Sequence, residues 1–109
     1  MTKRKNSKKP EEQDWEKALL RREALAMQRI RYMCKRRGTE PPTRPMSYTC
    51  ESCRRPRGAH GRGIAYDHCH RTKKFRGWLC GSCNMGLGLL GDTYMSVKRM
   101  LTYLERSRR

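Results

Sequence analysis

Apolar residues recur at helical spacing at both ends of this chain. Residues 10–37 predict a long helix, because Pro10 suits a first turn, acidic residues follow it and basic residues precede Gly38. The apolar positions share one side of that helix: Trp15, Ala18, Leu19, Ala26, Ile30 and Met33. Arg22 and Arg29 interrupt this side. The helix therefore either lies across the rest of the protein with its arginines reaching solvent, or it has an outside partner. In the second case it pairs with a second subunit or presents its arginines to a phosphate backbone: Arg21, Arg22, Arg29 and Arg31.

A second helical segment lies near the C-terminus. It follows Asp92, which we expect to act as its N-terminal cap. Its apolar stripe recurs at i, i+3, i+7 and i+10 and consists of Tyr94, Val97, Leu101 and Leu104. Such a stripe predicts a helix that covers the core, with contact to a second subunit as the alternative.

Between these helices the pattern predicts short strands. Residues 38–47 carry three prolines and predict an extended linker. Residues 64–66 and 75–79 are strand-like runs on either side of a polar turn, and residues 84–90 predict a short helix despite two glycines. The expected fold is therefore α+β, with a long N-terminal helix, a hairpin followed by a short helix, and a C-terminal helix.

The composition predicts a thin core that needs a staple. Hydrophobic residues are 35% of the chain and charged residues 34%. A single small domain of this kind usually depends on disulfides, a metal or a second subunit. The chain opens with basic residues and no apolar segment behind them, so we expect no secretory signal and no oxidising compartment. The six cysteines then favour zinc thiolate over disulfides, and Cys34 is expected to be a buried residue of the first helix.

The charge indicates a polyanionic partner. The net charge is +17 at pH 7, from 27 Lys and Arg against 10 Asp and Glu. Neutralising phosphates releases counterions, so this excess favours nucleic acid; the alternative is a solvated basic surface, as in a ribosomal or membrane-associated protein. Residues 1–9 form a basic arm that we expect to be disordered. No apolar run approaches the roughly 18 residues of a membrane span, so none is predicted.

Four cysteines form two Cys-x-x-Cys pairs, at Cys50/Cys53 and Cys80/Cys83. Each pair places two thiols on a tight turn, so the pairs can meet at one tetrahedral zinc ion. Four protein ligands would close the coordination shell, which makes this zinc structural; a redox pair is the competing interpretation. Residues 54–79, between the pairs, exceed the roughly 15 to 20 residues of common four-cysteine fingers and predict a structured insert.

The insert and the residue after it carry a set suited to phosphodiester hydrolysis. Asp67 and His68 follow the first strand-like run, and Asn84 follows the last cysteine directly. A neutral imidazole can activate the attacking water, and oxygen ligands such as Asp and Asn hold Mg²⁺ beside a phosphate. Each residue alone has a structural alternative: a hydrogen-bonded hairpin histidine, a turn aspartate and a helix-capping asparagine. Their joint placement favours the catalytic interpretation.

The same segment resembles a known family. The motif YDHCH at residues 66–70, together with residues 75–89, resembles the phage recombination endonuclease VII family of HNH, or His-Me finger, nucleases. The similar stretch covers about residues 48–106. The resemblance implies a ββα-metal fold held by a four-cysteine zinc, and a Mg²⁺-dependent cut that leaves a 5′-phosphate.

Matching positions then imply individual roles. By this resemblance His68 would be the general base and His70 a residue that positions the phosphate. Asp67 and Asn84 would be the Mg²⁺ ligands, and the two cysteine pairs would bind the zinc ion. Cys69 stands where an acid can occur in the family, so no role is carried over to it.

Symmetric cutting of a four-way junction requires two active sites and therefore two copies of the protein. The sequence does not establish which surface would join them. The chain stops at Arg109, whereas junction-resolving members of the family continue into a C-terminal region that helps to form their dimer. A homodimer would therefore use the helix of residues 10–37 or the last helix.

Together these observations predict a Mg²⁺-dependent DNA endonuclease. It would cut branched DNA, as a Holliday-junction resolvase does, or act as a nicking HNH nuclease; the alternative is a non-catalytic zinc-finger protein that binds nucleic acid. Residues 48–109 would form the nuclease domain, and its basic residues would contact the DNA backbone: Arg54, Arg55, Arg57, Arg62, Arg71, Lys73, Lys74 and Arg76.

Zinc and magnesium are the expected cofactors, with no small-molecule cofactor. DNA is the expected partner, and the cytoplasm of a bacterium or a phage-infected host the expected location.

Overall fold

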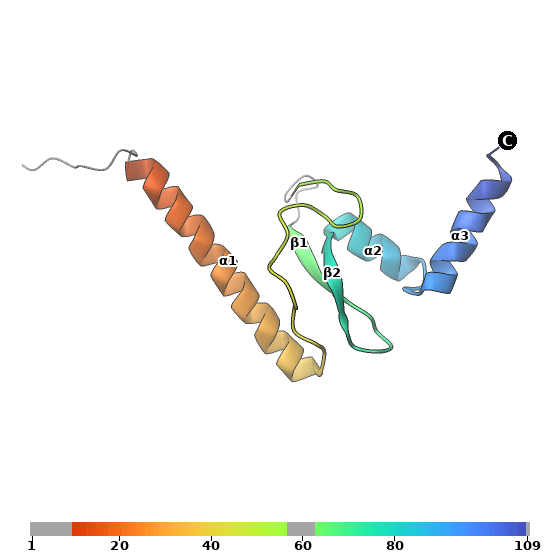
Figure 1. Cartoon of the computed structure of the whole chain (residues 1–109), viewed down its shortest axis with the longest axis horizontal. Helices are drawn as coiled ribbons and strands as arrows, with labels where there is room; N and C mark the ends of the chain where they lie inside the picture. The colour runs from red at the N-terminus through yellow and green to blue at the C-terminus, as the bar shows by residue number, and fades with distance from the viewer. Residues whose placement is uncertain (1–9, 57–62, 109) are drawn as a thin grey trace, which may run out of the picture.

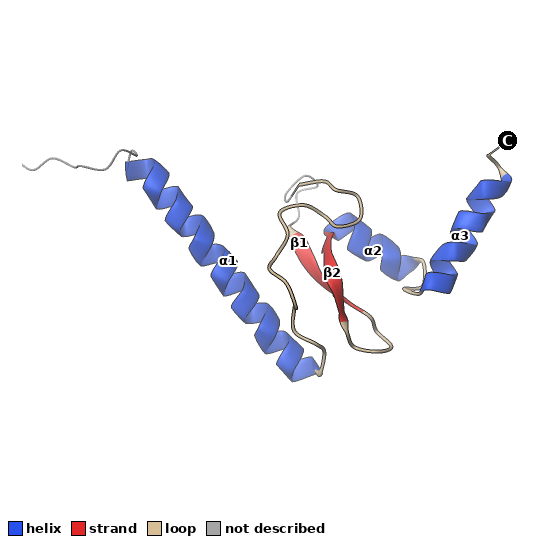
Figure 2. Cartoon of the chain, viewed as in Figure 1, coloured by secondary structure: helices blue, strands red, loops and turns tan. Residues whose placement is uncertain are grey.

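The computed structural model of the chain describes residues 10–56 and 63–108, with side chains described from residue 14 onward. The basic arm predicted at residues 1–9 lies outside these ranges. The elements follow in the order α1 (Pro10–Arg37), β1 (Ile64–His68), β2 (Phe75–Cys80), α2 (Gly81–Leu89) and α3 (Tyr94–Arg106) (Figure 2). The α+β fold expected from the sequence is confirmed. In the described part of the chain, none of the helices combines the length and the apolar character that crossing a bilayer requires.

The core is small and lies between the hairpin and the cysteine turns. β1 and β2 pair antiparallel, with Ile64 opposite Cys80 and Tyr66 opposite Trp78. Trp78 is fully buried, and Ile64, Cys50 and Cys80 pack with it. Most of the other large apolar side chains in the described ranges remain partly or largely exposed. A core of this size agrees with the expectation that the fold depends on a staple.

Helix α1 packs on the hairpin only through its C-terminal half. Met27 and Ile30 lie against the core, and Cys34 is buried as expected. Figure 1 shows the N-terminal half of α1 extending past the hairpin, and there Trp15 and Leu19 of the apolar side are 57% and 40% exposed. The helix therefore lies across the hairpin for part of its length, and the rest of its apolar side is uncovered.

The linker fixes the position of α1 beside both strands. Gly38 ends the helix in the left-handed region, at φ 74°, and its N–H donates to the carbonyl of Cys34 at 2.8 Å. Two residues later the carboxylate of Glu40 accepts a 2.7 Å hydrogen bond from the backbone N–H of Phe75. The carbonyl of Glu40 accepts another from the hydroxyl of Tyr66. Because these contacts reach β1 and β2 at once, they set the space between α1 and the hairpin.

Helix α2 begins at Gly81, earlier than the predicted start at residue 84. The reason is that Cys80 acts as its N-cap: the Cys80 side chain accepts a hydrogen bond from the backbone N–H of Cys83. Asn84 therefore lies in the first turns of the helix rather than ahead of it.

The cap predicted for α3 was wrong by one residue. Thr93 is the N-cap, and its hydroxyl accepts from the N–H of Ser96 at 3.0 Å while the Ser96 hydroxyl accepts from the N–H of Thr93 at 3.2 Å. Asp92 instead adopts a left-handed conformation, φ 61°, and its side chain turns back to the hairpin. The carboxylate is thus removed from the helix end that it was expected to cap.

The prediction that α3 covers the core was also wrong. No residue of α3 is buried, and Leu101 and Leu104 of its apolar stripe are 54% and 55% exposed. Gly91 and Asp92, both at positive φ, turn the chain after α2, and Figure 1 shows α3 projecting away from the hairpin on the far side of α2. Within the described residues the stripe is therefore largely uncovered, with only Val97 half-buried.

Candidate functional site

The two cysteine pairs meet at one point beside the hairpin. Cys50 and Cys53 come from the turn before β1, and Cys80 and Cys83 from the junction of β2 and α2. The four sulfur atoms all lie within 4.8 Å of one another, and the Sγ atoms of Cys53 and Cys80 are 3.8 Å apart. A tetrahedral zinc ion with Zn–S bonds near 2.3 Å places its sulfur ligands about 3.8 Å apart. The cluster therefore suggests a structural zinc site with a complete set of four ligands.

Backbone amides support the thiolate form that zinc requires. The N–H groups of Ser52 and Cys53 donate to the sulfur of Cys50 at 3.3 and 3.4 Å, and the N–H of Cys83 donates to the sulfur of Cys80 at 3.4 Å. Burial by itself would raise the pKa of Cys50, but the backbone hydrogen bonds outweigh it and lower this pKa to about 6. Hydrogen bonds of this kind favour metal binding over a neutral thiol.

A cavity of about 340 Å³ lies between α1 and the hairpin. Asp67 and His68 enter it from the end of β1, His70 from the following turn, and Asn84 from α2. The opposite wall is formed by one side of α1 and by one residue of the linker: Arg29, Ile30, Met33, Cys34 and Arg37 from the helix, and Thr39 from the linker. The structure thus brings together all four residues to which a catalytic role was assigned from the sequence.

A register shift in the hairpin affects how these side chains are aimed. Asp67 lies opposite Gly77, but His68 lies opposite Phe75, so Arg76 is the extra residue on β2. Irregularities of this kind bend a strand and redirect its side chains. Asp67 is only 7% exposed, whereas His68 is half-buried and His70 is exposed.

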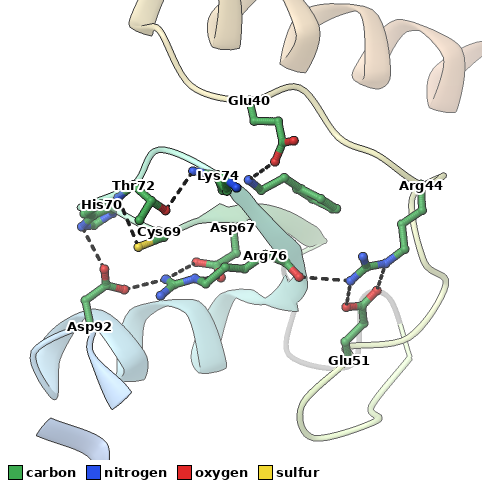
Figure 3. Close-up of polar contacts among 11 residues, drawn as sticks. Glu40, Arg44, Glu51, Asp67, Cys69, His70, Thr72, Lys74, Arg76 and Asp92 are labelled. Atoms are coloured by element: carbon green, nitrogen blue, oxygen red, sulfur yellow. Dashed lines mark hydrogen bonds and ion pairs between the residues drawn. The ribbon is translucent and has the colours of Figure 1, made fainter. Parts of the chain in front are cut away.

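Arg76 joins two carboxylates (Figure 3). Its Nε donates to Oδ2 of Asp67 at 2.8 Å, and its Nη2 donates to Oδ1 of Asp67 at 3.0 Å and to Oδ1 of Asp92 at 2.7 Å. The other oxygen of Asp92, Oδ2, lies 3.2 Å from Nδ1 of His70. The hydrogen bond to Asp67 raises the pKa of Arg76, so the guanidinium stays charged. The four side chains form one continuous series of contacts from β1 to the turn before α3.

The electrostatic environment of His68 favours its neutral form. Burial lowers the pKa of the imidazole below its ordinary value of 6.5, and the nearby charge of His70 acts in the same direction. Asp67 opposes these effects without outweighing them. The rings of His68 and His70 lie 4.9 Å apart, centroid to centroid.

Comparison with protein families identifies the kind of protein that carries this site. The model of the recombination endonuclease VII family matches residues 25–106, which is most of the chain. The chain belongs to the recombination endonuclease VII family. Membership confirms the resemblance found in the sequence and implies a nuclease that acts on branched DNA. Comparisons with curated proteins and with solved structures gave no match.

The family match begins at residue 25, earlier than the resemblance described from the sequence motifs, which begins near residue 48. It includes residues 25–37 of α1, the half of the helix that packs on the hairpin and forms one wall of the cavity. That half of α1 is therefore part of the unit that the family shares.

The eight basic residues expected to contact DNA fall into three groups. Arg57 and Arg62 lie outside the described residues. Arg76 is turned inward onto the two carboxylates. The other five are exposed, on the cysteine turn and on the tip of the hairpin: Arg54, Arg55, Arg71, Lys73 and Lys74. Contact of all eight with DNA stays a prediction.

Two features of the cavity and its surroundings were missed in the sequence. Arg37 lines the cavity, and its spacing of three from Cys34 and seven from Ile30 could have placed it on the packed side of α1. The contacts of Asp92 with Arg76 and His70 had no such signal, because they join residues far apart along the chain through a turn of unusual backbone conformation.

Proposed function

We propose that this member of the endonuclease VII family is a Mg²⁺-dependent DNA endonuclease that hydrolyses phosphodiester bonds in the cavity between α1 and the hairpin. The observation that carries the proposal is the convergence of Asp67, His68, His70 and Asn84 on that one cavity from three segments of the chain. A protein that only binds nucleic acid has no need to assemble a base and two oxygen ligands at one point.

The donor set of the cavity fits magnesium. Asp67 offers a carboxylate and Asn84 an amide oxygen, which are the hard ligands that Mg²⁺ prefers, whereas the four thiols belong to the separate cysteine cluster. Asp67 and Asn84 would hold the ion. When bound, Mg²⁺ neutralises the charge that develops on the phosphate and on the leaving oxygen.

His68 is our proposed general base. Its lowered pKa keeps the imidazole neutral at neutral pH, so a ring nitrogen is free to take a proton from the attacking water. His70, whose ring lies beside that of His68, would hold the phosphate in place. Both histidines line the cavity, so one phosphate could contact both.

Two arginines of α1 would hold the DNA strand from the opposite wall. Arg29 and Arg37 line the cavity, and neither is paired with an acid within the described chain. Unpaired guanidinium groups facing a site of phosphate chemistry are suited to flanking phosphates. The net charge of +17 adds a general attraction for the DNA backbone.

The finer description of the substrate and assembly is also part of the proposal. We propose a branched substrate such as a four-way junction, which needs two sites, and a homodimer that supplies them. Helix α3 is the better candidate for the dimer contact, because its apolar stripe is uninterrupted and exposed whereas arginines interrupt that of α1. In this account residues 48–109 are the nuclease domain, with α1 as its added wall, and a reducing cytoplasm keeps the thiols available for zinc.

The test is cleavage of two substrates by the purified full chain. Supercoiled plasmid and a labelled four-way junction are incubated with the protein in Mg²⁺ or in EDTA, at fixed salt. We expect cleavage in Mg²⁺ alone, with paired symmetric cuts on the junction and 5′-phosphate ends. Random single nicks in both substrates would favour a nicking nuclease over a resolvase. Tight binding with no cleavage in Mg²⁺ would favour the alternative, a zinc module that only binds nucleic acid.

A further inference from the structure

The turn between α2 and α3 places the carboxylate of Asp92 against the hairpin. Asp92 contacts two residues there: its Oδ2 lies 3.2 Å from Nδ1 of His70, and its Oδ1 accepts a 2.7 Å hydrogen bond from Nη2 of Arg76. The Asp92 side chain is only 15% exposed, so these contacts are largely removed from solvent. Asp92 does not itself line the cavity. It reaches the cavity only through the residues that it holds.

The backbone at this turn is specialised for that placement. Asp92 has φ 61°, a conformation uncommon for residues other than glycine, and Gly91 before it has φ 105°. The Asp92 N–H donates to the carbonyl of Leu87 at 2.9 Å, which fixes the turn to the end of α2. An unfavourable backbone conformation persists only where its surroundings hold it, and such positions gather at functional sites.

We propose that Asp92 is a positioning residue of the nuclease site. Through Oδ2 it accepts a hydrogen bond from Nδ1–H of His70 and so fixes the ring, and in the protonated ring Nε2–H is then the group that donates to a phosphate oxygen. Through Oδ1 it fixes Arg76, and Arg76 holds both carboxylate oxygens of Asp67. One side chain thus orients a proposed phosphate contact and a proposed metal ligand on two different segments (Figure 3). The inference rests on the proposed function, because it assigns Asp92 a part in that reaction.

Two substitutions remove the carboxylate without adding backbone strain. Asn and Gly both tolerate a positive φ, so Asp92→Asn and Asp92→Gly should fold. Glu105→Gln is the matched control, since Glu105 is an exposed acid on α3 and its loss changes the net charge equally. Zinc content and circular dichroism verify that all three variants keep the fold.

The kinetic test measures kcat and KM under multiple-turnover conditions, with the substrate that the wild-type protein cuts. Loss of a supporting hydrogen-bond partner typically reduces activity by about 10- to 100-fold, and we expect a decrease of this size in kcat for both Asp92 variants. KM should change less than kcat, because Asp92 does not itself line the cavity and acts only through His70 and Arg76. The Glu105→Gln protein should retain the wild-type rate.

The second readout does not depend on activity. In ¹⁵N NMR spectra of the imidazole groups, assigned with a His70→Gln variant, Nδ1 of His70 should carry the proton in the wild type. Asp92→Asn and Asp92→Gly should shift the two nitrogen signals toward the other tautomer, whereas Glu105→Gln should not.

The outcomes separate this inference from the function on which it rests. A wild-type protein that cleaves no DNA in Mg²⁺ contradicts the nuclease proposal as a whole. If the wild type cleaves but both folded Asp92 variants keep its kcat, the role of Asp92 alone is overturned. Unchanged His70 nitrogen signals in Asp92→Gly overturn it as well.

Discussion

At the scale of single residues, the environment of His68 gives the proposed chemistry a measurable pH dependence. Burial and the charge of His70 lower its pKa below 6.5, and only the unprotonated ring can accept a proton from water. We therefore expect kcat/KM to rise with pH through an inflection below 6.5 and then to level off. The measurement is kcat/KM for cleavage between about pH 5 and 8, at constant Mg²⁺ and ionic strength. An inflection above 6.5, or a rate that falls as pH rises, would contradict the assignment of His68 as the base.

The site residues that could be predicted are those that lie next to one another, or next to a recognisable motif, in the sequence. Asp67 and His68 are neighbours, and Asn84 adjoins a cysteine of the cluster, so their grouping followed from the motif and from the cysteine spacing. Asp92 was interpreted as a helix cap because an aspartate ahead of a helix usually is one. Arg76 was expected on the surface because nothing in the sequence shows that β2 turns it toward Asp67. Both depend on tertiary contacts that override a local preference.

At the scale of elements, the cysteine cluster should decide whether the hairpin and α2 fold. Zinc binding contributes about 10–16 kcal/mol in small zinc modules, more than a core of this size is expected to supply. We expect Cys83→Ser to reduce bound zinc from one ion per chain to nearly none, and to abolish the near-ultraviolet circular dichroism of the buried Trp78. Zinc content by mass spectrometry and circular dichroism check this.

Cys34→Ala is the control, because Cys34 is a buried cysteine, more deeply buried than Cys83, that lies outside the cluster. It should retain one zinc ion and the fold. A Cys83→Ser protein that keeps both would show that these thiols do not form the site.

The arginines of α1 should act on binding rather than on chemistry. Arg29 and Arg37 line the cavity from the wall opposite His68, so their loss removes phosphate contacts and leaves the proposed base in place. We expect Arg29→Ala and Arg37→Ala each to weaken junction binding and to reduce the slope of log K against log salt by about 1. Titrations at several salt concentrations measure this.

Lys35→Ala is the control for the two arginine variants, since Lys35 is an exposed cation of α1 that does not line the cavity. Lys35→Ala should weaken junction binding less than either arginine variant does, because it lowers only the net positive charge of the protein. Equal effects from all three substitutions would show that α1 contributes only diffuse charge.

The elements themselves were largely predictable, and their packing was not. Helix α1 has a proline at its start and a glycine at its end, so its existence and bounds followed from the sequence. The stripe of α3 was equally clear, but a stripe shows only that a face is apolar and not what covers it. The left-handed turn at Gly91 and Asp92 directs α3 away from the core, and no feature of the stripe could have revealed that.

At the scale of the whole molecule, the chain is extended rather than compact. Its radius of gyration is 19.1 Å, whereas a compact chain of this length has about 13 Å. Its accessible surface is 8815 Å², against about 6,300 Å² for a compact monomer of this mass. The excess reflects helices whose apolar residues are uncovered, including Leu101 and Leu104 of α3.

We therefore expect the protein to be a dimer in solution, joined through α3. Leu101→Glu combined with Leu104→Glu should give a monomer, because it places charges in the stripe. Thr102→Glu, on an exposed position outside the stripe, should leave the dimer intact. Sedimentation velocity at the concentrations of the cleavage assay distinguishes these states. A wild-type protein that sediments as a monomer there would contradict the dimer, though not the nuclease site.

The central claim is that the cavity between α1 and the hairpin is a hydrolytic site with His68 as its base. It is tested most directly by the single-turnover rate of Mg²⁺-dependent junction cleavage for the wild type and for His68→Ala, each verified to be folded and to hold one zinc ion. General base catalysis contributes about 10²- to 10⁴-fold, so we predict a loss of that size in the variant, with junction binding retained. A His68→Ala protein that cleaves at the wild-type rate, or a wild-type protein that cuts equally well in EDTA, would contradict the account.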